Sequence, residues 1–197
     1  MARKKQTSGG SARRTRSARQ EASTLRARLA RVRLVSLDVD GVMTDGRVVY
    51  GPDGRPAELQ FFHVQDGIAI EWLRQHGLAV VWITGRGSRA TELRAQELGV
   101  SELHARVKDK RAVLQDVQRR LGIAPEETLA MGDDLPDLAL AGVCGVFVAP
   151  ANAVREVRQC AALVTRTAGG AGAVRELVQA LLVARGQWRA LVARYRR

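Results

Sequence analysis

Two aspartates, Asp38 and Asp40, follow the short apolar run at 34–37 and precede a glycine turn. Side chains alternate faces along a strand, so both carboxylates would point the same way, about 6.5 Å apart along the chain. Two like charges in one site repel unless a cation neutralises them or one of them carries a proton. Carboxylate and carbonyl oxygens are the ligands that Mg²⁺ prefers. The spacing therefore predicts a magnesium site at the end of this strand, although a bare Asp-x-Asp is also typical of a solvated acidic turn.

The choice between these two interpretations depends on polar residues further along the chain. Thr84 directly follows the apolar run at 78–83, Asp133 follows the run at 128–131, and Lys110 stands at the start of an expected helix. The carboxyl ends of parallel strands meet at one edge of a sheet, where open α/β folds bind their ligands. We therefore expect these residues to lie together. The simpler alternatives are that Thr84 caps a helix and that Lys110 is a solvated residue of a first turn.

The elements that position these residues alternate between strand and helix along the chain, which predicts an α/β fold with a doubly wound, Rossmann-like parallel sheet. Two β-type runs around the Gly/Pro/Asp loop at 51–56 predict a β-hairpin flap. We expect Asp66 to cap its helix, and the glycine run at 169–172 to be a flexible hinge. The expected strands are 34–37, 78–83, 102–105, 128–131, 143–148 and 163–165, and the expected helices are 24–33, 66–76, 88–98, 109–121, 136–141, 152–159 and 172–185.

The net charge of +12 belongs mainly to the N-terminal part of the chain. Residues 1–33 hold 11 of the 32 Lys and Arg residues and one of the 20 acidic residues, so the rest of the chain is close to neutral. We expect 1–23 to be a disordered basic tail, 24–185 a single folded domain and 186–197 a basic C-terminal extension. The tail could be solubilising, could be an organelle transit peptide, or could bind nucleic acid, although it has no aromatic residue for base stacking.

No membrane span is expected, because no run approaches the roughly 18 apolar residues that one requires. The two cysteines, Cys144 and Cys160, have no metal-ligand spacing and lie in apolar stretches, so we expect small core residues rather than a disulfide. These features predict a reduced protein located in the cytoplasm.

Four motifs together resemble those of the haloacid dehalogenase-like phosphohydrolases, over residues 32–177. They are Asp38-Val39-Asp40-Gly41-Val42, Ile83-Thr84-Gly85-Arg86, Lys110 and Gly132-Asp133-Asp134. Within that superfamily, the stretches 38–46, 62–67 and 167–176 resemble the 3-deoxy-D-manno-octulosonate 8-phosphate phosphatases, whose relatives act on nonulosonate 9-phosphates. The gaps between the motifs are too short for a cap domain, which indicates the uncapped branch. The resemblance implies a homotetramer, in which the hairpin at 47–62 and a neighbour's C-terminal segment close the site.

The resemblance also implies a role for each polar residue. Asp38 would be the nucleophile that forms an aspartyl-phosphate, and Asp40 would be the general acid and base. Mg²⁺ would be held by the Asp38 carboxylate, the Asp40 backbone carbonyl and Asp133. Thr84 would hold phosphoryl oxygens, and Lys110 would balance their charge.

For the last acid of the motif, Asp134, two interpretations stay open: it orients Lys110 or a metal-bound water, or it caps the next helix. The substrate site implied by the resemblance includes Asp40 and Lys110, with His63, Val64, Gln65, Asp66, Gly67, Arg86 and Arg94 as its lining. Gln65 departs from the expected basic residue, and so does Glu71 nearby.

The predicted function is thus Mg²⁺-dependent hydrolysis of a keto-sugar acid phosphate, 3-deoxy-D-manno-octulosonate 8-phosphate, in lipopolysaccharide biosynthesis. Two alternatives stay open. One is a phosphatase for another phosphomonoester, either a nonulosonate 9-phosphate or a nucleic acid 3′-phosphate. The other is a binding protein that uses the basic tail on nucleic acid or on a protein partner.

Overall fold

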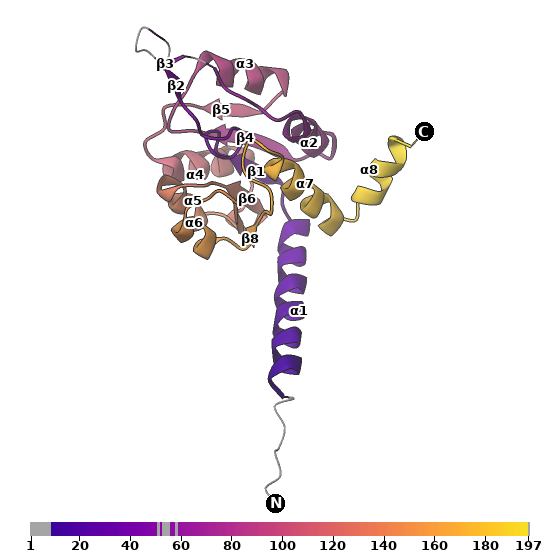
Figure 1. Ribbon diagram of the computed structural model, residues 1–197. Coiled ribbons are helices and arrows are strands. Elements are labelled where there is room, and N and C mark those ends of the chain that lie inside the picture. The colour runs from indigo at the N-terminus through magenta and orange to yellow at the C-terminus, as the bar shows by residue number, and fades with distance from the viewer. Residues whose placement is uncertain (1–8, 51, 53–55, 58, 197) are drawn as a thin grey trace, which may run out of the picture.

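A computed structural model describes residues 9–50, 52, 56–57 and 59–196, with the backbone alone at 9–19, 56 and 57. Its centre is a six-stranded sheet in the order β5-β4-β1-β6-β7-β8, in which every pair is parallel (Figure 1). The predicted α/β class and doubly wound sheet are confirmed. The strands are β1 (Leu34–Leu37), β4 (Ala79–Ile83), β5 (Glu102–His104), β6 (Thr128–Met131), β7 (Val146–Ala149) and β8 (Leu163–Val164).

Side-chain alternation along the strands divides the interior into two cores. On β1, Val35 and Leu37 belong to one core and Leu34 to the other, and all three are fully buried. On β4, Trp82 faces the first core while Val81 and Ile83 face the second. A strand covered on both faces is apolar at successive positions, which explains the continuous runs in the sequence.

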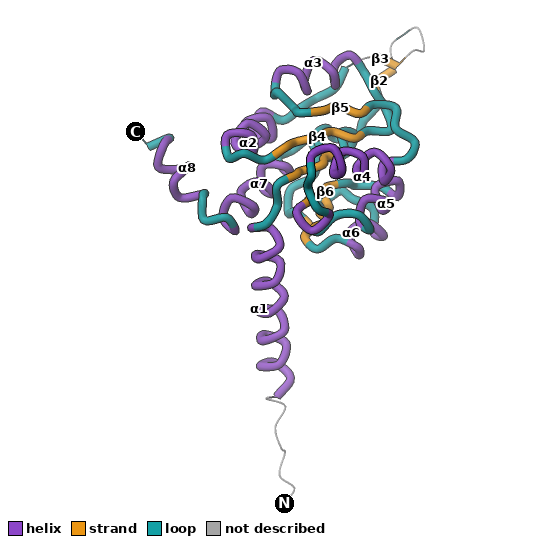
Figure 2. Tube along the Cα trace, turned by 180° about the vertical axis from the view of Figure 1, so that it is seen from behind, coloured by secondary structure: helices purple, strands orange, loops and turns teal. Residues whose placement is uncertain are grey.

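Helices cover both faces of the sheet, and their ends follow local capping signals. One core is closed by α1, α2, α3 and α7, and the other by α4, α5 and α6 (Figure 2). The Ser88 side chain accepts a hydrogen bond from Thr91 N at the start of α3, and Asp109 does the same for Ala112 N at the start of α4. The helices are α1 (Gly9–Ala30), α2 (Val64–Gln75), α3 (Arg89–Glu97), α4 (Lys110–Leu121), α5 (Leu138–Ala141), α6 (Arg155–Cys160), α7 (Ala173–Ala184) and α8 (Trp188–Arg194), with 3₁₀ turns η1 (Pro125–Glu127) and η2 (Leu135–Asp137).

The prediction that Asp66 caps its own helix is wrong. The N-cap of α2 is His63, and Asp66 lies inside the first turn, fully buried. Its two oxygens accept hydrogen bonds from Gly172 N (3.1 Å) and Arg175 N (2.7 Å), so it caps α7 instead. A carboxylate at a helix N-terminus satisfies amide groups that have no partner within the helix.

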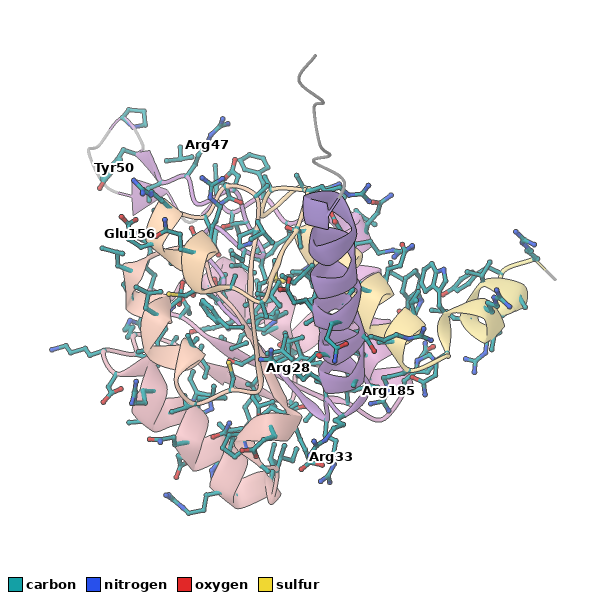
Figure 3. The ribbon with its side chains drawn as sticks, turned by 90° about the horizontal axis from the view of Figure 1, so that it is seen from below. Arg28, Arg33, Arg47, Tyr50, Glu156 and Arg185 are labelled. Carbon is teal, nitrogen blue, oxygen red and sulfur yellow. The ribbon has the colours of Figure 1, made fainter. Side chains whose placement is uncertain are left out.

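The N-terminal segment differs most from expectation. α1 begins at Gly9, so residues 9–23 are helical rather than disordered, and residues 1–8 of the predicted tail lie outside the described part. Residues 9–23 include four Arg and three Ala, which are good helix formers. Figures 1 and 2 show most of α1 extending away from the body. Its last turns are held by Leu29 in the core, by Leu25 packed against it, and by Arg28 (labelled in Figure 3), whose Nε donates to Gly145 O at 2.9 Å.

The C-terminal extension expected at 186–197 contains a short helix, α8, beside the end of α7 (Figure 1). It is held by an aromatic cluster. The Arg175 guanidinium carbon lies 4.5 Å from the centre of the Trp72 ring and 4.8 Å from that of Trp188, and Trp72 Nε1 donates to the Tyr195 hydroxyl at 2.9 Å. A cation between two indole rings is favourable because the ring faces are electron-rich.

The predicted hairpin flap consists of β2 (Val49–Tyr50) and β3 (Pro56–Ala57), which pair antiparallel, while its turn falls largely outside the described residues. Between β1 and β4 the described residues form only this hairpin and α2, and between β4 and β6 they form α3, β5, α4 and the turn η1. The described part of the chain therefore has no cap domain. It also contains no helix of the length and apolar character that crossing a bilayer requires.

Cys144 is partly buried, whereas Cys160 is exposed at the end of α6, so the expectation of a core position is wrong for Cys160. Both thiols are free.

Candidate active site

The carboxyl ends of β1, β4 and β6 meet around a cavity of about 280 Å³. Its lining includes Asp38 and Asp40 after β1, Thr84 after β4 and Asp133 after β6. The two acids predicted to face the same side of the first strand both line this cavity, although they lie beyond the end of β1. The sheet edge therefore brings together the polar residues that the sequence separates by almost a hundred positions. The remaining lining residues are Gly46, Gly85, Arg86, Lys110, Asp134, Pro136 and Asp137.

Three acids at this edge can share one ion. Carboxylate oxygens of Asp38, Asp133 and Asp137 all lie within 4.8 Å of one another. The ammonium group of Lys110 stands between two of them, 2.9 Å from Asp38 Oδ1 and 2.6 Å from Asp137 Oδ1. Asp38, Lys110 and Asp137 are each at least nine-tenths buried. One lysine beside three carboxylates leaves an excess of negative charge that suits a divalent cation.

Burial and mutual repulsion perturb the titration of this cluster. Burial raises the pKa of Asp38 to about 7, with the Asp137 carboxylate adding to the rise and Lys110 opposing it. Burial likewise raises the pKa of Asp133 to about 7, helped by Asp137 and Asp134. For Lys110, burial disfavours the charge, but Asp38 and Asp137 outweigh it and the pKa is raised. The metal-free site therefore holds protons near neutral pH, and a dication would displace them.

The predicted metal ligands Asp38 and Asp133 fit this cluster. The Asp40 carboxylate is not one of its three acids, which is compatible with a metal contact through the Asp40 backbone carbonyl; that contact stays a prediction. The Asp40 side chain lies instead beside Thr84, whose hydroxyl donates to Asp40 Oδ2 at 3.3 Å and accepts from Arg86 N at 3.1 Å.

Asp137 is a site residue that the sequence analysis missed. Of the two roles considered for Asp134, the structure shows the cap, since its Oδ1 accepts from Leu135 N at 2.8 Å. Asp137 pairs with Lys110, as Asp38 does, and its Oδ2 also accepts from Asp133 N at 3.0 Å. The available signal was its four-residue spacing from Asp133, which returns the chain to the same side after one turn.

The stretch predicted to line the substrate site lies away from the acids. In this chain Arg86 lines the acidic cavity, whereas residues 63–67 and Arg94 do not, and Gln65 borders a different hollow with Arg166 and Arg175. Asp66 is fully buried as the cap of α7, which leaves its carboxylate no contact for a ligand.

The rest of that stretch, with its neighbours, has mixed exposure. His63 is partly buried, Val64 and Gln65 are exposed, and Gly67 is buried against Arg94. Arg94 lies over the Phe62 ring, 5.9 Å from its centre, and pairs with Glu97. Glu71 is exposed on α2 and accepts from Gln75, so its departure from the expected pattern lies outside the acidic cavity. A substrate role for these residues stays a prediction.

The glycine run at 169–172 makes a close contact rather than a hinge. A Cβ on Gly169 would overlap the carbonyl oxygen of Gly41, and Gly170 N donates to Val42 O at 3.1 Å. Asn152 joins the same two segments, because its amide nitrogen donates to Gly41 O (2.9 Å) and its oxygen accepts from Gly169 N (2.7 Å). The run therefore supports the loop that follows Asp40.

Comparisons with known proteins show the family of this chain. Residues 100–177 match the model of the haloacid dehalogenase-like hydrolase family. The chain is 39% identical to the 3-deoxy-D-manno-octulosonate 8-phosphate phosphatase of Escherichia coli over 161 residues, 82% of this chain and 85% of the relative. It is 39% identical to that of Yersinia pestis over 157 residues, 80% and 83% of the two chains.

Two solved structures have the same fold. The phosphatase of that name from Moraxella catarrhalis, in complex with magnesium ion, phosphate ion and KDO, matches with a TM-score of 0.84 and 32% identity over 88% of this chain and 98% of that one. A probable phosphatase from Pseudomonas syringae pv. phaseolica matches with a TM-score of 0.85 and 35% identity over 90% and 98%. The chain therefore belongs to the 3-deoxy-D-manno-octulosonate 8-phosphate phosphatase family of the haloacid dehalogenase-like hydrolases.

Proposed function

We propose that this protein is a Mg²⁺-dependent phosphatase that hydrolyses the phosphomonoester of a keto-sugar acid, 3-deoxy-D-manno-octulosonate 8-phosphate. The observation that carries the proposal is the convergence of Asp38, Asp133, Asp137 and Lys110 at one sheet edge, with Asp40 beside them. The family relationship supports the same chemistry.

Each residue has a position that suits its proposed task. Asp38 would attack phosphorus and form an aspartyl-phosphate while Asp40 gives a proton to the leaving sugar oxygen; Asp40 would then take a proton from the water that hydrolyses the intermediate. Lys110 offers a cation to the transferring group, and Asp137 keeps that cation in place. Asp38, Asp133 and the Asp40 backbone carbonyl would hold Mg²⁺, which would supply positive charge beside the phosphoryl group.

The sugar carboxylate needs a cation of its own. The exposed Arg86, on the rim of the acidic cavity, can offer it a planar pair of donors. Gln65 stands where a basic residue is expected, which keeps a nonulosonate 9-phosphate as a second candidate substrate.

A turnover screen tests the proposal. We expect phosphate release from 3-deoxy-D-manno-octulosonate 8-phosphate in the presence of Mg²⁺, none after EDTA, and much slower release from simple hexose phosphates. Faster turnover of a nonulosonate 9-phosphate would change the proposed substrate and leave the proposed phosphatase mechanism intact. Turnover that persists in EDTA would contradict the metal-dependent mechanism.

We also propose a homotetramer and a cytoplasmic location. The flap, the segment after it and the start of α2 expose Tyr50, Phe61 and Val64, each by more than 60%, which supports burial of this surface by a second copy. Light scattering at assay concentration should give four times the mass of one chain. A fully active monomer would contradict this assembly.

A further inference from the structure

Gln60 lies beside one of the reacting acids, in the segment that leads from the flap to α2. Its Nε2 donates to Asp40 Oδ1 at 3.2 Å, on the carboxylate oxygen opposite to the one that accepts from Thr84. Asp40 thus receives one hydrogen bond on each oxygen. Two donors from different directions fix the plane of a carboxyl group, which a single donor leaves free to rotate about its last bond.

The orientation of the Gln60 amide is itself set by two hydroxyl groups. Gln60 Oε1 accepts from Ser88 Oγ at 2.7 Å and from Thr91 Oγ1 at 2.6 Å. With its oxygen occupied, the amide can present only its nitrogen to Asp40, and the reversed amide would place a carbonyl oxygen against a carboxylate. Thr91 is fully buried and Ser88 is the N-cap of α3, so both hydroxyl groups are held by the helix.

We infer that Gln60 is a positioning residue for the proposed phosphatase reaction. Through its hydrogen bonds it connects the first turn of α3 to Asp40 and orients the Asp40 carboxyl group toward the leaving oxygen. The inference rests on the proposed role of Asp40 as the general acid. A proton donor that is displaced by even a small rotation loses much of its effect, because proton transfer requires hydrogen-bond geometry.

The leaving group of the substrate separates this role from a structural one. A sugar alkoxide must be protonated as it leaves, whereas p-nitrophenolate is stable without a proton. We compare kcat/KM, which reports the steps through phosphoryl transfer and excludes the later use of Asp40 as a base. Gln60→Met keeps the side-chain length and removes the amide.

We expect Gln60→Met to lower kcat/KM for the sugar phosphate at least tenfold and to lower that for p-nitrophenyl phosphate less than threefold. Thr91→Val removes one hydroxyl donor to the amide. It should lower kcat/KM for the sugar phosphate about two- to fivefold and lower that for p-nitrophenyl phosphate less. Gln60→Glu keeps the acceptor for the two hydroxyl groups but has no donor for Asp40, and we expect a larger loss than for Gln60→Met. Glu92→Gln, a solvent-facing change on the same turn of α3, should leave kcat/KM unchanged for both substrates.

Equal losses on both substrates for Gln60→Met, or no loss on either, would overturn the inference and leave the proposed function intact. Absence of any phosphomonoester turnover by the unmodified protein would overturn the proposed function instead. A crystal structure of Gln60→Met then decides the geometry without activity: the inference predicts a rotated Asp40 carboxyl group, and an unchanged one contradicts it.

Discussion

At the scale of single residues, the acidic cluster combines features that oppose each other in the metal-free protein. Asp38 is buried and Asp133 is half-buried beside Asp137, and Lys110 offsets part of their negative charge. In an unfolded chain an aspartate has a pKa near 3.9. Here the pKa of both Asp38 and Asp133 is raised to about 7. Between the unfolded-state pKa of about 3.9 and this native-state pKa of about 7, the native protein therefore binds more protons than the unfolded chain.

The sign of the pH dependence follows from that difference. Where the native state binds more protons, the free energy of unfolding falls as pH rises. We expect the metal-free protein in EDTA to lose stability from pH 5 to pH 8 and to regain it at pH 8 when Mg²⁺ is added. Asp133→Asn should weaken this dependence. Urea unfolding at pH 5 and pH 8 measures the free energy of unfolding of both proteins. If the difference between wild type and Asp133→Asn were the same at the two pH values, the raised pKa of Asp133 would be contradicted.

The site residues that could be predicted from the sequence share one property. Asp38 and Thr84 come directly after an apolar strand, and Asp133 follows another after one intervening residue, so the topology of the sheet alone brings them together. Asp137 and Gln60 have no such signal. Asp137 ends a 3₁₀ turn, and Gln60 reaches Asp40 only because the flap segment packs against α3, which is a tertiary contact.

At the scale of elements, α2 and α7 are joined through Asp66, a contact that no local pattern reveals because its partners lie more than a hundred residues away. The strands of the six-stranded sheet were predictable to within about three residues, since their apolar runs reflect burial on both faces. The start of α1 was not predictable, because a polar, arginine-rich sequence is compatible with both helix and disorder.

Removing the Asp66 carboxylate should destabilise the fold. Asp66→Ala leaves Gly172 N and Arg175 N without an acceptor in a buried place, which costs about 1–3 kcal/mol in the free energy of unfolding. Asp66→Asn, which retains one acceptor oxygen, should lose less. The exposed Asp116→Ala on α4 is the control and should change the urea midpoint little. Equal midpoints for the Asp66 and Asp116 variants would contradict the capping role.

At the scale of the whole molecule, the charge and the chemistry occupy different regions. The acidic cavity lies at the carboxyl edge of the sheet, while the basic residues concentrate on the segment that precedes β1. Figure 1 shows most of α1 projecting from the body, away from the flap. This separation favours small-molecule turnover that is independent of the tail.

Deletion of residues 1–23 tests that independence. It retains Leu25 and Leu29, which anchor α1 to the core. We expect unchanged kcat/KM for the sugar phosphate at low and at high salt. A large loss with steep salt dependence would instead indicate a nucleic acid substrate recruited by the basic tail.

The most direct test of the central claim compares wild type with Asp38→Asn on 3-deoxy-D-manno-octulosonate 8-phosphate in Mg²⁺, with substrate and metal binding measured on both proteins. We predict that wild type releases phosphate, and that Asp38→Asn binds both ligands but releases none, because an amide cannot act as the nucleophile. Phosphate release by Asp38→Asn at the wild-type rate would contradict the account.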